Sequence, residues 1–288
     1  MTLARSVVVC VVILAVAGST AGAGQTARVD GPSVRDLLQT ARKEASAGNA
    51  AAALESLRKA RALAPNSEEV LSAYAQLTLG AWLLLPAILT LQSLTRICPT
   101  VAQYQYLLGV AFMEGGDMPA AIESLTAADR LEPENSRTLL ALALARNSSK
   151  QYVDARTAAT KSLDLDPENV DAVAALAEAE AGAGDVGQAA DHAQRALARA
   201  PAHPTANLVM GIVFMQQEQY AAARDALERA VAAAPDSFVA HYQLSLAYAR
   251  LGNDAEAQKH VALYQQKQRE MNDRIRALRS GAAPDKRP

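Results

Sequence analysis

Apolar residues recur at helical spacing along most of this chain, in short blocks that are separated by turn-forming residues. In each case a first block ends at a turn, and a second block of similar length follows it. In one example the first block contains Leu108, Gly109 and Phe112, and the second contains Ala121, Leu125 and Ala128. In another the first block contains Met210, Gly211 and Phe214, and the second contains Ala223, Leu227 and Ala230. The pattern predicts a helix, a short turn and a second, antiparallel helix, repeated along the chain.

The paired blocks repeat with a period of 34 residues. Proline and alanine keep this period independently, which chance does not explain. The prolines are Pro65, Pro99, Pro133, Pro167, Pro201 and Pro235, and the alanines are Ala53, Ala87, Ala121, Ala155, Ala189, Ala223 and Ala257. The frame predicts seven units, at 34–67, 68–101, 102–135, 136–169, 170–203, 204–237 and 238–271.

The residues that repeat have physical reasons to do so. The alanine predicts a close crossing of the two helices of a pair, because a larger side chain would push them apart. Glycine followed by Asn or Asp, as at Gly48-Asn49 and Gly184-Asp185, is expected to stop one helix and cap the next. The proline fixes the exit turn, and a helix-starting residue follows it, as in Pro65-Asn66-Ser67.

A unit of this length with Gly or Ala, Tyr or Phe, Ala and Pro in that order resembles the tetratricopeptide repeat (TPR). The resemblance covers residues 34–271 and implies an all-α fold, a right-handed superhelical α-solenoid of antiparallel helix pairs. The chain departs from the family pattern in three ways. The usual early tryptophan is replaced in every unit, the second unit lacks a polar turn, and the last unit has Arg269 in place of proline.

The two ends of the repeat region differ from its middle. Residues from Ala255 to about Arg279 read as one long polar helix, whose end (272–279) lies beyond the seventh unit. Such a helix suits a solvated cap, because the last unit of an array has no neighbour on one side. Residues 280–288 are predicted to be a disordered tail, and residues 24–33 a flexible leader.

The first 23 residues have the pattern of a secretory signal peptide. Arg5 supplies the positive charge, an apolar run extends from Val7 to Ala17, and Ala21-Gly22-Ala23 is a small-residue cleavage signal. We expect cleavage after Ala23 and a periplasmic or secreted protein. The alternative is an uncleaved membrane anchor, although the run is short for a bilayer span.

Composition narrows the class of protein. Half of the residues are hydrophobic and only 4% are aromatic, so the core must consist mainly of Ala, Leu and Val. A net charge of -2 gives no basic surface for nucleic acid. After cleavage Cys98 is the one cysteine left, which excludes a disulfide within the chain. It is expected to be an apolar filler, with a reactive or intermolecular thiol as the alternative.

Three patterns look like chemistry, and none has the context that chemistry needs. Residues 182–187 match G-x-G-x-x-G, but a helix precedes them where a dinucleotide site needs a strand. Asp164, Asp166 and Glu168 alternate as in a calcium loop, yet the glycine and the final glutamate of such a loop are missing. No metal-ligand spacing is found among His192, His203, His241 and His260. The sequence predicts no enzyme, no cofactor and no metal.

The resemblance implies that ligands bind the concave surface, which the first helix of each pair lines. In the family frame the inward-facing residues are Tyr106, Val110, Met113, Leu140, Leu144, Leu208, Ile212, Met215, Tyr242 and Leu246. They lack the Lys and Asn with which related adaptors hold an acidic C-terminus. A groove of this kind suits an amphipathic helix or an extended apolar peptide. The alternative is that some of these side chains pack on neighbouring helices.

The second unit reads Trp82-Leu83-Leu84-Leu85-Pro86 where its turn should be polar. Leu84 matches an apolar position of the other units and is predicted to be core. Trp82, Leu83 and Leu85 have no such role, and we predict an apolar patch at the edge of the array for docking or self-association. A membrane span at 77–91 is the alternative, but that run is short and contains Pro86.

These patterns predict a non-catalytic scaffold or adaptor outside the inner membrane, with a role in envelope assembly or secretion. Its partner would be a protein or peptide of unknown identity, with no nucleic acid and no membrane span after cleavage. The alternative from another class is a structural, self-associating subunit of an envelope complex, a homo-oligomer.

Export of the protein tests the predicted signal peptide and its cleavage. The intact mass of the mature protein should correspond to a chain that starts at Gly24, because Ala21 and Ala23 frame the cleavage site. A mature form that retains Met1 would contradict both the cleavage and the soluble assignment.

Overall fold

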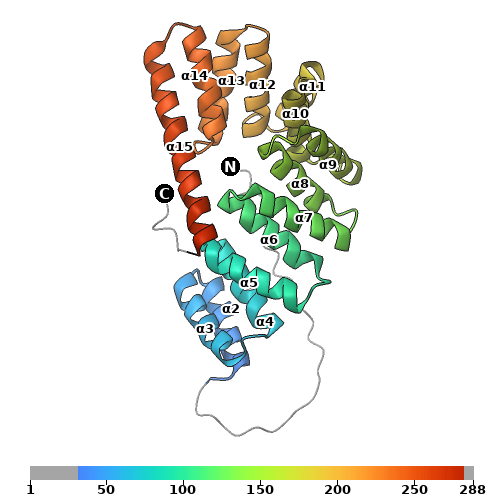
Figure 1. Cartoon of the computed structure of the whole chain (residues 1–288), viewed down its shortest axis with the longest axis vertical. Coiled ribbons are helices and arrows are strands. Elements are labelled where there is room, and N and C mark those ends of the chain that lie inside the picture. The colour runs from blue at the N-terminus through green and yellow to red at the C-terminus, as the bar shows by residue number, and fades with distance from the viewer. Residues whose placement is uncertain (1–31, 282–288) are drawn as a thin grey trace. The chain divides into compact units, whose positions relative to one another are not determined.

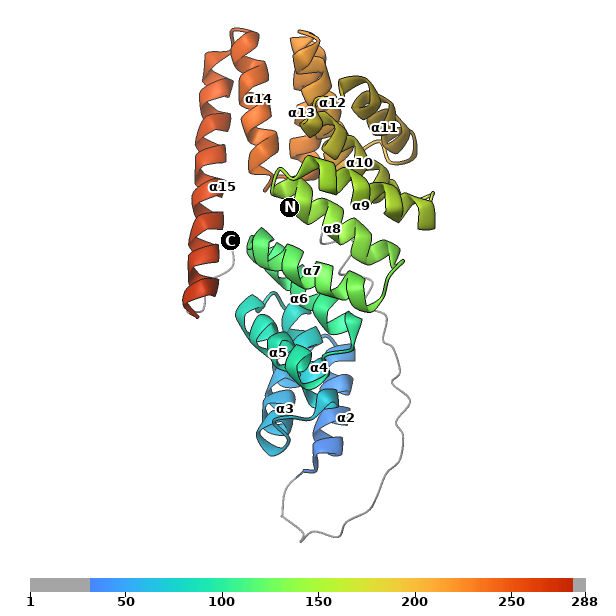
Figure 2. The ribbon, with the colours of Figure 1, turned by 45° about the vertical axis from the view of Figure 1, so that its right-hand side comes forward.

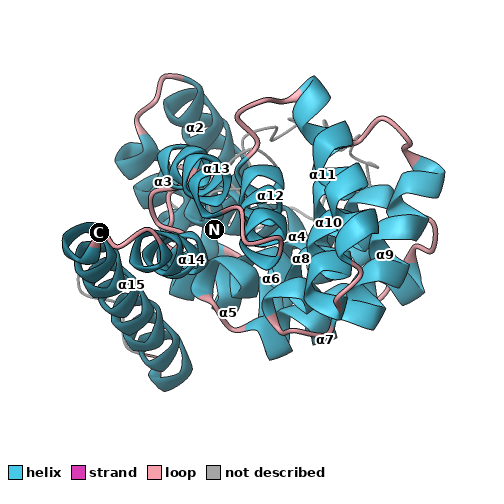
Figure 3. Ribbon diagram, turned by 90° about the horizontal axis from the view of Figure 1, so that it is seen from above, coloured by secondary structure: helices cyan, strands magenta, loops and turns pink. Residues whose placement is uncertain are grey.

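The structure is a computed structural model that describes residues 32–281. These residues form fourteen α-helices, with no strand among them (Figure 3). The predicted signal peptide (1–23) lies outside the described residues, as do 24–31 of the leader and 282–288 of the tail. The all-helical prediction is confirmed over the described part of the chain.

One antiparallel pair of helices falls in each of the seven predicted units, and the two helices of each pair pack against each other. The second helix of the last pair is about twice as long as the others. The pairs are α2 (Val34–Ser46) and α3 (Ala50–Leu63), α4 (Glu68–Gly80) and α5 (Leu84–Ile97), α6 (Ala102–Gly115) and α7 (Met118–Leu131), α8 (Ser136–Ser148) and α9 (Tyr152–Leu165), α10 (Val170–Ala183) and α11 (Val186–Arg199), α12 (Pro204–Gln216) and α13 (Tyr220–Ala233), and α14 (Phe238–Arg250) and α15 (Asp254–Ser280).

The contacts divide the chain after Cys98 into two compact units. The N-terminal unit contains α2–α5, and its core includes Leu57, Val70 and Tyr74. The C-terminal unit contains α6–α15. Within it α10 contacts both α8 and α12 as well as its pair partner α11, so the first helices of successive pairs lie next to one another (Figure 2).

The predicted close crossing of paired helices is present. Six of the seven repeated alanines, from Ala53 to Ala223, have no exposed surface, and Ala257 is also buried. Glycines on the facing helices lie equally close. A Cβ added at Gly109 would come within 2.5 Å of Leu125 Cγ, and one at Gly211 within 2.4 Å of Leu227 Cγ. Small residues on both helices therefore set the distance between them.

Every turn between paired helices contains one residue in the left-handed region, at the same place in each unit. Four of these residues are glycines, for which positive φ carries no steric penalty. The seven are Gly48, Trp82, Gly116, Lys150, Gly184, Glu218 and Gly252, with φ between 59° and 94°. The apolar turn of the second unit therefore has the same backbone as the others, with Trp82 in the position that glycine usually takes. Leu84 is buried, as predicted.

The expected capping by Asn or Asp at these turns is mostly wrong. Of the three predicted caps, Asn253 caps its helix through its side chain, whereas Asn49 and Asp185 make no such bond. Asp117, at the matching turn of the third unit, makes none either. Side-chain caps instead start the first helix of each pair in six units, through Ser33, Ser67, Asn135, Asn169, His203 and Ser237. The left-handed residue already ends one helix and redirects the chain, so the side chain after it is free to bond elsewhere.

The alanine column gives a direct test of the packing. We expect Ala121→Leu and Ala189→Leu each to lower the free energy of unfolding by about 1–3 kcal/mol through overpacking. Ala198→Leu, at an exposed position of α11, is the matched control and should change stability little. Urea titration compares the three, and equal midpoints would show that the helices do not cross at these alanines.

Candidate peptide-binding surface

The predicted inward-facing residues of the C-terminal unit lie on the first helices α6, α8, α12 and α14. Three of them, Val110, Leu140 and Leu208, are buried. Five are half-buried and pack on the core clusters, namely Tyr106, Met113, Leu144, Ile212 and Met215. Tyr242 and Leu246 are 43% and 37% exposed. The predicted surface is therefore partly core, and only the outer parts of its half-buried side chains are accessible.

In the last pair, the predicted groove residues face α15. The rings of Tyr242 and Tyr264 lie 5.3 Å apart between centroids, and Leu246 and Val261 line a groove of about 370 Å³ between α14 and α15. The polar composition of α15 predicted only a solvated cap, so the contribution of this helix to the groove was not predicted. Ala257, Val261 and Tyr264 recur at helical spacing, which was the signal for an apolar face.

A carboxyl group lies at the same repeat position as Leu144 and Ile212. Glu178 on α10 accepts a 3.3 Å hydrogen bond from the Asn147 side-chain amide, which also donates to the Ala175 carbonyl at 2.8 Å. Burial raises the pKa of Glu178 to about 7, against the lowering effect of this hydrogen bond. The protonated form of Glu178 is therefore favoured more than that of an exposed glutamate, which reduces the negative charge on this surface.

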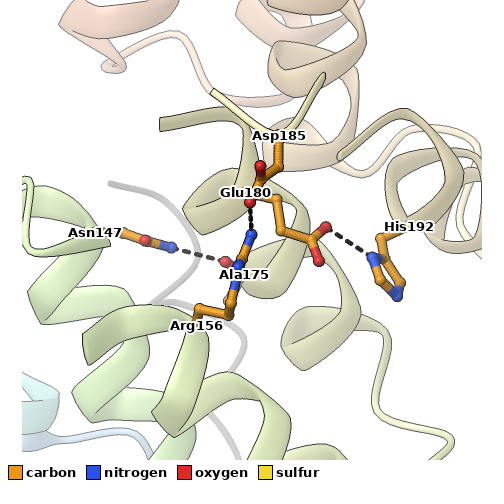
Figure 4. Close-up of polar contacts among 6 residues, drawn as sticks. All are labelled: Asn147, Arg156, Ala175, Glu180, Asp185 and His192. Atoms are coloured by element: carbon orange, nitrogen blue, oxygen red, sulfur yellow. Dashed lines mark hydrogen bonds and ion pairs between the residues drawn. The ribbon is translucent and has the colours of Figure 1, made fainter. Parts of the chain in front are cut away.

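Polar side chains near this carboxyl are held by one another (Figure 4). Glu180 is buried on α10 and lies 2.7 Å from His192 Nδ1 on α11. Arg156 on α9 pairs with Asp185, the residue that begins α11. These contacts join neighbouring helices and give His192 a structural partner.

The other three histidines also have structural partners. His203 caps α12 through Nδ1 and places Nε2 2.9 Å from Asp171. His241 and His260 stack with their Nδ1 atoms 2.9 Å apart, and burial together with His241 lowers the pKa of His260. Asn207, which replaces the family tryptophan, is fully buried and bonds to the carbonyls of Pro201 and His203. These groups stabilise helix junctions.

The predicted edge patch lies in the N-terminal unit. Trp82 and Leu83 are each 38% exposed, and Leu89 on the next turn of α5 is also exposed. Leu85, which we also assigned to the patch, is half-buried. Cys98 ends α5 and is partly accessible, and burial raises the pKa of its thiol.

Residues 32–281 contain no group of three or more His, Cys, Asp or Glu residues that could hold a metal ion. This part of the chain also has no helix that combines the length and the apolar character of a membrane span.

Comparison with known proteins identifies the repeat. The tetratricopeptide repeat family profile matches residues 87–136, 106–169, 138–204 and 208–268. A tetratricopeptide repeat protein from Parabacteroides merdae has a similar structure, with a TM-score of 0.70 and 13% identity over 85% of this chain and 98% of that one. No curated protein matches the sequence.

Two smaller structures are similar to part of the chain. The MamA protein gives a TM-score of 0.55 and 23% identity over 57% of this chain and 90% of its own. YrrB, described as a TPR protein with an unusual peptide-binding site, gives 0.50 and 18% over 65% of this chain and 96% of its own. At these identities the likeness concerns the fold alone.

The raised pKa of Glu178 gives a pH-dependent prediction. Because this pKa is higher in the folded chain than its usual 4.5, the folded chain loses stability as the pH rises from about 4.5 to about 7. Glu178→Gln removes this loss. It should be more stable than the parent at pH 8 by about 1–3 kcal/mol and similar at pH 4.5.

Urea titration at the two pH values measures the difference. Glu123→Gln, at an exposed position of α7, is the control and should leave the pH dependence unchanged. If Glu178→Gln keeps the parent's pH dependence, the carboxyl is ionised in the folded chain and the inner surface is more polar than we describe.

Proposed function

Because the chain belongs to the tetratricopeptide repeat family, we propose that it is a non-catalytic protein-interaction scaffold. The C-terminal unit would bind an apolar peptide or an amphipathic helix against the first helices of its pairs. Proteins built from these repeats generally hold other proteins or peptides and do not carry out reactions. A structural neighbour of this chain is described as having a peptide-binding site, which agrees with such a role.

The observation that carries the proposal is the chemistry of the inner surface. Its half-buried residues are tyrosine, methionine, leucine and isoleucine, on α6, α8 and α12. Methionine side chains adapt to ligands of different shape, and an apolar helix face would bury the outer parts of all of them. The carboxyl of Glu178, with its pKa of about 7, disfavours an acidic ligand and tolerates an apolar one.

We place this activity outside the inner membrane. The support is the sequence at 1–23, with its positive residue, apolar run and small-residue cleavage signal. A periplasmic or secreted scaffold of this type would serve envelope assembly or secretion. The ligand would then be an apolar segment of an exported protein.

Peptide selection on the mature chain tests the binding surface. From a random library of about 15-residue peptides, we expect apolar or amphipathic helical sequences to be enriched. Met113→Ala combined with Met215→Ala should weaken binding of a selected peptide at least ~tenfold, because both side chains would lie beneath it. Isothermal titration measures the affinities.

Met118→Ala is the matched control, since Met118 is half-buried against the same core cluster as Met113 but lies on the second helix of the pair. It should change the affinity less than about twofold. Selected peptides that are mainly acidic, or that bind both variants equally, would contradict the proposed surface.

The second candidate function, self-association, depends on the exposed Trp82 and Leu83. If they form an interface, the emission of Trp82, the one tryptophan of the chain, should shift to the blue as the protein concentration rises. Leu83→Ser should abolish this shift and the matching rise in mass by light scattering. Leu63→Ser, at an exposed position of the same unit, should not. If the emission of Trp82 does not change with protein concentration and the protein stays monomeric, self-association is contradicted and the adaptor function remains.

A further inference from the structure

The last helix is far longer than its pair requires. α15 has 27 residues, whereas α14 has 13. The two helices are antiparallel, and the C-terminal half of α15 extends beyond the N-terminal end of α14 (Figures 1 and 2). Its two buried residues, Ala257 and His260, both lie in the part that pairs with α14. The far end of α15 contacts α6, the first helix of the third repeat. The C-terminal unit is thus bridged from its last repeat to its first.

Polar groups make the first part of this contact. The Arg279 guanidinium donates to both oxygens of the Asp117 carboxylate, at 2.9 and 3.0 Å. Arg274 donates to the Glu114 carbonyl at 3.4 Å. Asp117 is buried, and the hydrogen bonds from Arg279 hold its pKa below the usual value. The paired geometry fixes both the position and the orientation of the arginine.

Apolar groups make the second part. Met271, Ile275 and Leu278 lie at i, i+4 and i+7, the spacing of one helix face. They cover the two glycines at the end of α6. A Cβ added at Gly115 would come within 2.4 Å of Leu278 Cδ1, and one at Gly116 within 2.2 Å of Met271 Sδ.

Gly115 has no backbone reason to be glycine. The residue after it, Gly116, has the positive φ that the turn requires, but Gly115 is the last residue of α6 and needs no such conformation. The other six units hold a side chain at this place, namely Ala47, Ala81, Ser149, Ala183, Gln217 and Leu251. The third repeat lacks a Cβ at the point where Leu278 packs, which indicates a site built to receive α15.

We propose that residues 271–280 are a clasp, an internal ligand that docks on the turn of the third repeat and controls access to the inner surface of the C-terminal unit. While docked, it ties the seventh repeat to the third, so that α15 runs from its partner α14 to α6 (Figure 1). The docking itself stands on the contacts above. Its effect on ligand entry rests on the proposed function.

The clasp is built to open. None of its residues is buried, whereas the first half of α15 is anchored by Ala257, by the stacked His241 and His260 and by the ring of Tyr264. The side chain of Arg279 is 62% exposed, so salt weakens its pairing with Asp117. Elements with few buried contacts open before the rest of a fold. Residues 271–280 are therefore the part of α15 that opens first.

Hydrogen exchange of the full chain tests the docking. In the parent, amides of 271–280 should be protected, although less strongly than those of 254–264, because the clasp opens first. Gly115→Leu inserts a side chain where Leu278 lies, and it should speed exchange in 271–280 at least ~tenfold while leaving 254–264 unchanged. Gly187→Leu is the matched control, because a Cβ there meets nothing within 4 Å.

A charge exchange separates the clasp from a general loss of fold. Asp117→Arg and Arg279→Asp should each release residues 271–280, and the double variant should restore their protection. Unprotected amides at 271–280 in the parent, or a double variant no better than the singles, would overturn the docking.

Thiol labelling tests the control of access without a ligand. With Cys10 and Cys98 changed to serine, Met215→Cys places one thiol on the inner surface. A maleimide carrying a polyethylene glycol chain should react at least ~tenfold faster in Gly115→Leu than in the parent or in Gly187→Leu. Equal rates, with exchange showing the clasp released, would overturn the gating and leave the proposed function standing. The gating would be supported if the thiol reacts faster in Gly115→Leu and the methionine variants lose peptide binding.

Discussion

The close approach of two helices at a small residue is the constraint on which this structure depends. Six of the seven repeated alanines have no exposed surface, and in two units a glycine on the facing helix, Gly109 or Gly211, leaves no room for a Cβ. This distance lets large neighbours such as Leu125 and Leu227 fill the space between helices, and both are fully buried. Because the same contact recurs in every unit, the first helices stack in one layer. That layer forms the inner surface of the C-terminal unit.

The fold could be predicted from the sequence because its determinants are local and periodic. The alanine and the proline fix the unit length, and the structure places one helix pair in each unit. The turns show where such reasoning fails. The sequence indicated capping by Asp185, yet Asp185 pairs with Arg156 on another helix, and Asp117 at the matching turn of the third unit bonds to Arg279. A side chain's partner in another helix depends on tertiary contacts, which local pattern does not report. Trp82 shows the reverse, an unusual residue in an ordinary backbone.

The inner surface was predicted in outline, and its detail was not. Position within the repeat located Ile212 and Met215 correctly on first helices, but it did not separate them from the buried Val110 and Leu140. The burial of each side chain depends on how closely its helix packs against the neighbouring helices. The same limit hid α15, since its polar composition gave no sign that Arg279 and Leu278 would meet residues about 160 positions earlier. Gly115 was the available signal, as the one glycine at that place in any unit.

Position-specific crosslinking in the host most directly tests whether this layer is a binding surface. A photoreactive phenylalanine analogue at Ile212, on the first helix α12, would sit on the inner surface. The same analogue at Val153, 76% exposed on the second helix α9, would sit away from it. Our account predicts adducts with an exported protein from position 212, joined through an apolar segment, and few or none from position 153. Adducts that form equally well at both positions, or only at 153, would contradict it.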